Sequence, residues 1–388
     1  MTVSDEPCRA TLAPVRRLVV KVGSSVLTQA GEQGVNSRVV GRLVAQAAEL
    51  VRGGRQVIIV TSGAISAGLK RLGILGKHKG MPFKQAAAAV GQTLLMQAYE
   101  RSFARYGLNV GQVLLTHEDV QERRRFLNAR NTLLTLLAQG AVPIINENDT
   151  VAVEEIQFGD NDTLAAQVAN MAEADLLVLL SDVEGMFTAD PALESGAERL
   201  SVIRGIGRAV RSAAGMSRSP LAVGGMVTKL EAIRIVGALG IPAVIARGRS
   251  SRVLPRLLAG EDVGTLFLPE GPRLTHRKGW IAFALKPRGW LQVDRGARRA
   301  LVEQGRSLLP SGVADLGGSF EFGDPVSCRD EEGREFARGL VNYGARELAQ
   351  IRGHHTRDIE HILGYKYYDE VIHRDNLTLL REESGGAP

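Results

Sequence analysis

The chain has 388 residues, of which 44% are hydrophobic and 23% are charged, and it carries a formal net charge of +6. This length favours two domains, and the composition is that of an ordinary globular protein. There is no apolar run of about 18 residues, which argues against a membrane span. Two cysteines are too few for a disulfide framework, and residues 1–15 do not resemble a signal peptide, so we expect a cytoplasmic protein with a loose N-terminal tail over residues 1–15.

The positive charge is unevenly distributed along the chain. Residues 276–388 contain 17 Lys and Arg and 17 Asp and Glu, so the excess lies in residues 1–275. A basic balance there suits an enzyme with polyanionic substrates at least as well as a nucleic-acid-binding protein. The neutral C-terminal part disfavours a surface that follows RNA phosphates.

From residue 16 to residue 270, short apolar runs alternate with longer amphipathic segments. Most of the runs are continuous Val, Ile or Leu, which is typical of parallel strands covered on both faces. The predicted strands are 17–23, 56–63, 109–116, 141–146, 174–182 and 241–248, and the predicted helices are 38–54, 83–107, 125–140, 162–174 and 226–240. This order predicts an α/β domain over 16–270, with a mainly parallel open sheet sandwiched by helices and ligands at the carboxyl ends of the strands.

The residue pattern of the sequence changes after about residue 270. A linker rich in Pro, Gly and basic residues, "LPEGPRLTHRKGW", precedes short runs with frequent glycines and charged turns. We therefore expect a small β-rich domain over 276–376, with one helix near 296–305, and a C-terminal tail over 377–388.

Two lysines stand where anions could bind. Lys21 interrupts the apolar run "LVVKVG", a costly place for a charge unless it reaches an anion or snorkels to water from an edge strand. Lys229 lies in the first turn of a predicted helix after Gly224-Gly225, where a cation opposes the helix dipole. Ser62-Gly63 opens another helix after a strand, which suits either an ordinary cap or an anion site.

The segment "INENDTVAVEEIQFGDND" (145–162) concentrates acids and amides around what looks like a short hairpin. Turn chemistry and a binding site both explain it. The sequence does not match the P-loop or the dinucleotide-binding motif, and its histidines and cysteines show no metal-ligand spacing. Two lysines, glycine turns and acids suit phosphoryl transfer, which depends on positioning and charge neutralisation. The absence of an obvious His base favours a carboxylate acceptor, which is already ionised at neutral pH.

The motifs "VVKVGSSVLT", "VTSGAISAG", "RRRFLNARNTLLTLL", "VPIINENDTVAVEEIQFGDND", "LLSDVEGMFTADP" and "GGMVTKL" resemble those of the glutamate 5-kinases in the amino acid kinase family. The segment "GHHTRDIEHILGYKYYDEVIHRDNL" resembles the end of their C-terminal PUA domain. The resemblance implies ATP-dependent phosphorylation of the L-glutamate side-chain carboxylate to L-glutamyl 5-phosphate, the first step of proline biosynthesis. It also implies feedback inhibition by proline, a homo-oligomer (dimer or tetramer) and glutamyl phosphate reductase as a partner. Mg²⁺ is expected with ATP, because Mg²⁺ is usually held largely by phosphates and water.

The resemblance also assigns roles to individual residues. It implies that Lys21 and Lys229 bind phosphate in catalysis and that Asp160 holds these lysines in place. It implies substrate binding by Ser62, Asp149 and Asn161, with Asp162 beside them. The implied nucleotide contacts are Lys21, Gly23, Ser181, Asp182, Gly224, Gly225, Met226, Val227, Thr228, Lys229 and Val223, the last standing where the family usually has Thr.

Two other functions remain open at this stage. PUA domains are named for RNA-modifying proteins, and Tyr343, Tyr365, Tyr367 and Tyr368 could stack on bases, although tyrosines of a small β domain belong more often to its core or rim. Another amino acid kinase, acting on acetylglutamate, aspartate or carbamate, would share the lysines and glycines.

Overall fold

The computed structural model describes residues 6–27, 35–74, 80–151, 161–204 apart from 190, 192 and 195, 225–269, 276–283 and 285–380. The chain divides into two compact units, Met1–Arg273 and Leu274–Pro388. This division falls inside the linker expected from the sequence. In the described parts, no helix combines the length and apolarity needed to cross a membrane.

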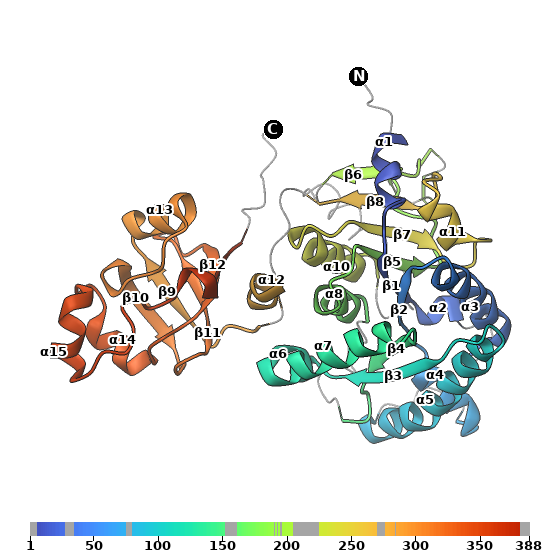
Figure 1. The fold of residues 1–388 in the computed structure, drawn as a ribbon, viewed down its shortest axis with the longest axis horizontal. Coiled ribbons are helices and arrows are strands. Elements are labelled where there is room, and N and C mark those ends of the chain that lie inside the picture. Colours follow the sequence, from blue (N-terminus) through green and yellow to red (C-terminus); the bar gives the residue numbers. More distant parts are fainter. Residues whose placement is uncertain are drawn as a thin grey trace. The chain divides into compact units, whose positions relative to one another are not determined.

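The first unit is built on an eight-stranded sheet (Figure 1). Its strands are β1 (Arg17–Val22), β2 (Gln56–Val60), β3 (Val110–Leu115), β4 (Val142–Glu147), β5 (Leu176–Ser181), β6 (Val202–Arg204), β7 (Ala243–Arg247) and β8 (Thr265–Leu268), in the spatial order β3-β4-β2-β1-β5-β7-β8-β6. Pairing is parallel from β3 through to β7, and β8 runs antiparallel to β7. The predicted mainly parallel sheet is confirmed, with β6 and β8 added at one edge.

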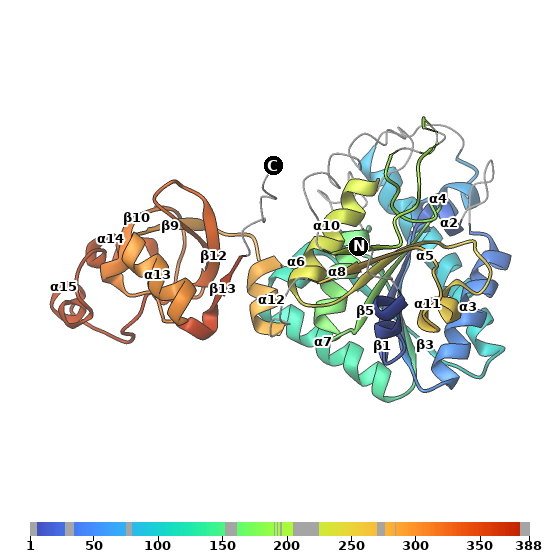
Figure 2. The same ribbon diagram turned by 90° about the horizontal axis from the view of Figure 1, so that it is seen from above.

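Helices cover both faces of this sheet (Figures 1 and 2). On one face lie α3 (Ser37–Arg52), α5 (Met81–Ala104) and α11 (Val253–Leu258), and on the other lie α7 (Arg123–Ala138), α8 (Asn161–Met171) and α10 (Met226–Ala238). Leu18, Val20 and Val22 of β1 belong to the core shared with α3, α5 and α11. Because strand side chains alternate between faces, Lys21 lies on the opposite face, toward α8.

Shorter helices connect these layers. They are α2 (Ser24–Leu27), α4 (Ala64–Arg71) and α6 (His117–Gln121). Helix α4 follows β2 directly, through Gly63 in the left-handed conformation with φ of 99°. A residue with a side chain is strained there, so this glycine fixes the abrupt passage from strand to helix.

The N-terminal residues correct the expectation of a loose tail over 1–15. Residues 6–12 form α1 (Glu6–Arg9) and a 3₁₀ turn (Ala10–Leu12). Arg9 is 1% exposed, and its guanidinium donates to the carbonyl oxygens of Ser201, Glu261, Val263 and Gly264 and pairs with Asp262. One arginine thus satisfies several carbonyl groups around β6 and β8, and this binding orders the segment.

The second unit contains a five-stranded sheet of order β10-β9-β11-β12-β13, in which only the β9–β11 pair is parallel. The strands are β9 (Gly289–Val293), β10 (Val313–Gly318), β11 (Pro325–Arg329), β12 (Glu335–Leu340) and β13 (Leu377–Leu379), and the helices are α12 (His276–Phe283), α13 (Arg295–Gln304), α14 (Ala345–Ile351) and α15 (Ile359–Leu363). The predicted β-rich domain and its helix near 296–305 are present. The expected tail starts too early, because Leu377 and Thr378 are buried in β13 and the Thr378 hydroxyl donates to the Lys278 carbonyl.

Candidate active site

Lys21 lies near the carboxyl end of β1, in the middle of the sheet of the first unit. β1 lies between β2 and β5, so Lys21 is on a central strand rather than an edge strand. Its side chain is 8% exposed. Snorkelling from a sheet edge is therefore excluded, and the buried ammonium group needs a counter-charge.

Asp162 supplies this counter-charge for both predicted lysines. Lys21 Nζ lies 2.6 Å from Asp162 Oδ1, and Lys229 Nζ lies 3.4 Å from Asp162 Oδ2. The Thr228 hydroxyl donates to the same Oδ2 at 2.8 Å. A strand end (β1) and the first turns of two helices (α8 and α10) thus converge on one carboxylate.

The electrostatics of this cluster favour an anionic ligand. Complete burial alone would raise the pKa of Asp162, but Lys21, Lys229 and Thr228 together bring the pKa of this carboxyl below its usual value. Among the described residues, two ammonium groups thus contact one ionised carboxylate. Each ammonium has three N–H groups, so both lysines can contact Asp162 and still donate to phosphate oxygens.

The described residues place lysine contacts on Asp162, and the role implied for Asp160 stays a prediction. The sequence comparison assigned the positioning of the lysines to Asp160 and placed Asp162 beside the substrate. The lysine contacts lie on Asp162, the second residue of α8. Asp160 and the hairpin expected before it lie outside the described residues. From the first turn of α8, the Asp162 carboxylate reaches Lys21 of β1 and Lys229 of α10.

Asn161 is held by a chain of amide hydrogen bonds that the sequence did not reveal. Asn161 Nδ2 lies 3.0 Å from Asn146 Oδ1 and 2.9 Å from both Thr61 O and Ser62 Oγ. Asn146 Nδ2 in turn donates to Gln92 Oε1 of α5 at 2.9 Å. These hydrogen bonds fix the orientation of the Asn161 amide group. They also link α5, β4 and α8.

The amide chain leaves two buried polar atoms without a hydrogen-bond partner in the described structure. They are Asn161 Oδ1 and Gln92 Nε2. Unpaired buried groups are rare and costly, and they often indicate a missing ligand or water. A free acceptor on Asn161, next to Ser62, is suited to a substrate N–H group.

Asp149 follows Asn146 by three residues and is half-buried. Burial raises the pKa of its carboxyl to about 6. A carboxylate that is costly to ionise becomes easier to ionise when a cation binds beside it. Asp149 is therefore a candidate for binding a substrate ammonium group, in line with the role implied from the sequence.

The implied nucleotide contacts lie partly within the described chain. The structure describes Gly23, Ser181, Asp182, Gly225, Met226, Val227 and Thr228, whereas Val223 and Gly224 lie outside it. Gly23 N donates to the Leu180 carbonyl at 3.2 Å, and the Ser181 hydroxyl donates to Asp182 Oδ1 at 3.0 Å. The ends of β1 and β5 are therefore adjacent, and the first turn of α10 joins them through Lys229 and Asp162.

The described residues contain no group of three or more His, Cys, Asp or Glu side chains that could hold a metal ion. In the second unit, Tyr343 is buried and its hydroxyl donates to the Tyr368 carbonyl. Tyr367 is 80% exposed. Of these two tyrosines, one belongs to the core and the other to the surface.

Comparison with known proteins identifies the family of the chain. Residues 16–247 match the amino acid kinase family, and residues 289–363 match the PUA domain. The chain belongs to the amino acid kinase family. Within it, the chain is 52% identical over 369 residues to the glutamate 5-kinase of Geobacter sulfurreducens, covering 95% of this chain and 99% of that protein.

Other glutamate 5-kinases have a similar sequence identity to this chain. The enzyme of Citrifermentans bemidjiense is 51% identical, with 95% of this chain and 99% of that protein covered. The enzyme of Moorella thermoacetica is 49% identical, with 97% of this chain and the whole of that protein covered. The resemblance noted in the sequence to the glutamate 5-kinases of the amino acid kinase family, followed by a PUA domain, is confirmed.

Proposed function

We propose that the protein transfers the γ-phosphoryl group of ATP to the side-chain carboxylate of L-glutamate, giving L-glutamyl 5-phosphate and ADP in the first step of proline biosynthesis. The observation that carries the proposal is the convergence of Lys21 and Lys229 on the buried Asp162. The glutamate 5-kinases that match over nearly the whole chain support the choice of acceptor.

The two lysines have the chemistry that phosphoryl transfer needs. As the bond from the γ-phosphorus to the β-γ bridging oxygen breaks, negative charge spreads over the transferring oxygens and the leaving group. Lys21 and Lys229 neutralise this charge from a buried position, where electrostatic effects are strong. Asp162 acts as a positioning residue, because it holds both ammonium groups in place before the nucleotide arrives. The acceptor carboxylate is already ionised at neutral pH, so the reaction requires no general base.

Glutamate recognition falls to the residues at the ends of β2 and β4. The carboxylate of Asp149 and the free Oδ1 of Asn161 both suit the α-ammonium group of the amino acid. The Ser62 hydroxyl, 2.9 Å from Asn161 Nδ2, is available for a substrate carboxylate. Such a set of charge and hydrogen bonds would orient the side-chain carboxylate toward the nucleotide.

We propose that Mg²⁺ enters as MgATP. Mg²⁺ usually keeps several waters and is held by substrate phosphates with one or two carboxylates, so it needs no dedicated protein cage. The lack of a cluster of three metal ligands among the described residues is compatible with this mode of binding. Gly23, Ser181, Asp182 and the first turn of α10 (Gly225 to Thr228, with Val223 and Gly224 before it) would bind the nucleotide.

The resemblance also supports finer proposals. We propose that proline inhibits the enzyme, that the chain forms a homo-oligomer (dimer or tetramer) in the cytoplasm, and that glutamyl phosphate reductase consumes its labile product. We do not propose RNA binding, because residues 276–388 carry 17 basic and 17 acidic side chains and so offer no net positive charge to attract phosphates.

A direct test uses hydroxylamine, which traps an acyl phosphate as a hydroxamate. The protein is incubated with MgATP and, separately, with glutamate, aspartate, N-acetylglutamate or carbamate. We expect hydroxamate from glutamate, with ADP formed in equal amount. Product from aspartate or N-acetylglutamate but none from glutamate would overturn the proposed acceptor.

A further inference from the structure

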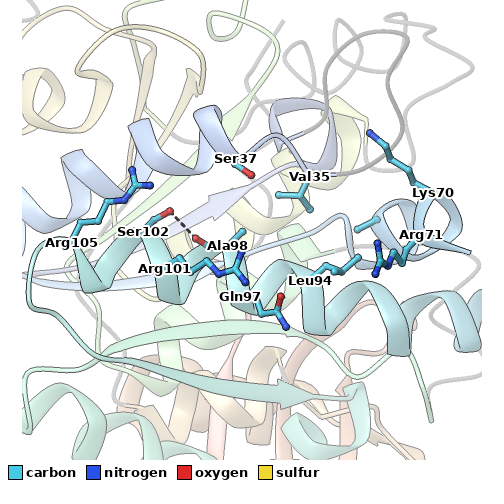
Figure 3. A pocket seen from close by; sticks show the side chains of 11 residues that line it. Val35, Ser37, Lys70, Arg71, Leu94, Gln97, Ala98, Arg101, Ser102 and Arg105 are labelled. Carbon is cyan, nitrogen blue, oxygen red and sulfur yellow. Dashed lines mark hydrogen bonds between the residues drawn. The ribbon is translucent and has the colours of Figure 1, made fainter.

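A second anion-binding candidate lies away from the lysine pair, in a cavity of about 610 Å³ between α3, α4 and α5 (Figure 3). The lining residues that the structure describes include none of those named around Asp162. This volume is within the range of about 300–1,000 Å³ that is typical of small-molecule sites.

Close packing of α4 on α5 forms one wall of the cavity. A Cβ atom on Gly68 would lie 1.7 Å from the Ala87 carbonyl oxygen, and one on Gly91 would lie 1.7 Å from the Ala64 carbonyl oxygen. Only glycines permit the two helix backbones to approach so closely. The last turn of α4 is thereby held against α5, and its basic residues face the same cavity as those at the end of α5.

Among the described residues, four cationic side chains line the cavity, and no carboxylate does. They are Lys70, Arg71, Arg101 and Arg105, all exposed, and within the described residues none of them forms an ion pair. Elsewhere in the same unit, exposed arginines do pair with acids, as in Arg252–Glu49, Arg234–Glu231 and Arg256–Glu261. Four unpaired cations around one cavity repel each other, and an anion would relieve this repulsion.

The arrangement of the lining residues indicates the chemical class of the ligand. Figure 3 shows Lys70 and Arg71 at one end of the cavity, Arg105 at the other end, and Arg101 and Gln97 between them. Charges spread in this way match several anionic groups in a row better than a single phosphate. Leucine, valine and alanine side chains in the lining offer contact to an uncharged part of the ligand, and Ser37 and Ser102 also line the cavity.

We infer that this cavity is a second binding site for a small molecule that carries a chain of phosphates. Arginines at both its middle and its end would bind the phosphate oxygens through charge-assisted hydrogen bonds. The site is separate from the proposed catalytic site, so a ligand bound here need not be the substrate nucleotide.

The test is calorimetric titration of the full-length protein with inorganic tripolyphosphate in the absence of Mg²⁺. The test variant is Arg101→Gln/Arg105→Gln, and the matched control is Arg16→Gln/Arg357→Gln, which removes two exposed arginines outside the cavity. We expect the test variant to lose one binding site per chain, or to bind there about tenfold more weakly, while the control behaves as the unaltered protein. The glutamate-dependent turnover of the test variant should stay unchanged.

Three results would overturn the inference. One is a binding isotherm of the test variant that matches that of the unaltered protein. Another is an equal loss of binding in the control, which would indicate a general charge effect. The third is a change of oligomeric state in sedimentation with tripolyphosphate binding intact, which would make this face a contact between copies of the chain. The titration needs no catalysis, so a failure of the proposed kinase activity would leave it interpretable.

Discussion

Replacing Asp162 by Asn tests whether one carboxylate holds the active-site lysines. At an effective dielectric constant of about 20, ion pairs at 2.6 and 3.4 Å correspond to about 6 and about 5 kcal/mol of gross attraction. The cost of removing the charges from water offsets much of this. Breaking a buried pair by removing one partner costs about 3–5 kcal/mol, because the remaining charge stays buried. Asp162→Asn removes the charge that both ammonium groups contact, so we expect the free energy of unfolding to fall by about 4 kcal/mol and the melting temperature to fall by about 10 °C.

The assay is thermal and urea-induced unfolding of the full-length protein, with and without ATP. Added ATP should recover more stability in Asp162→Asn than in the unaltered protein, because its phosphates supply the lost counter-charge. Glu184→Gln is the matched control, since it breaks an exposed pair with Arg247 at 3.2 Å and should cost at most about 1 kcal/mol. If both variants unfold at the same temperature and urea concentration, the reasoning about Asp162 is refuted.

Three further predictions concern the kinetics. Lys229→Met should lower kcat about 100-fold with the KM for glutamate changed less than about threefold, and an unchanged kcat would remove Lys229 from the transition state. The pKa of Asp149 is raised to about 6, and its ionised form binds the ammonium group. We therefore expect kcat/KM for glutamate to fall as the pH decreases through about 6. Asp149→Asn, measured from about pH 5 to about pH 8, should lack this decrease. Gln92→Leu should raise the KM for glutamate about tenfold and leave the KM for ATP unchanged, because Asn146 and then Asn161 lose their orientation. Gln97→Leu, on the exposed face of the same helix, is its control, and equal effects in both variants would contradict the role of the amide chain.

The sequence predicted the strands at the centre of the sheet because each is a continuous apolar run long enough to be recognised. β6 and β8 were missed, since three or four residues at the edge of a sheet give little periodicity. Arg9 was missed for a different reason. A single arginine in a polar segment does not indicate that carbonyl groups about 190 to 255 residues away will surround it.

The site was predictable where a residue conflicts with its surroundings. Lys21 in an apolar strand and Lys229 in a first helical turn are such conflicts, and both side chains form ion pairs with Asp162. The contact of Asp162 with both lysines was not predicted, because the sequence does not fix to one residue where α8 begins. Gln92 gave no signal, because a glutamine in a long helix is ordinary until its neighbours are known.

The bonds of Arg9 also bear on how the unit assembles during synthesis. Its acceptors, from Ser201 to Gly264, leave the ribosome long after Arg9 itself, and β1, the first strand made, must await β5 for its second neighbour. Contacts between such distant parts of a chain slow folding. The earliest residues therefore find their partners last, and the growing chain has an unfinished edge until nearly the whole first unit has emerged.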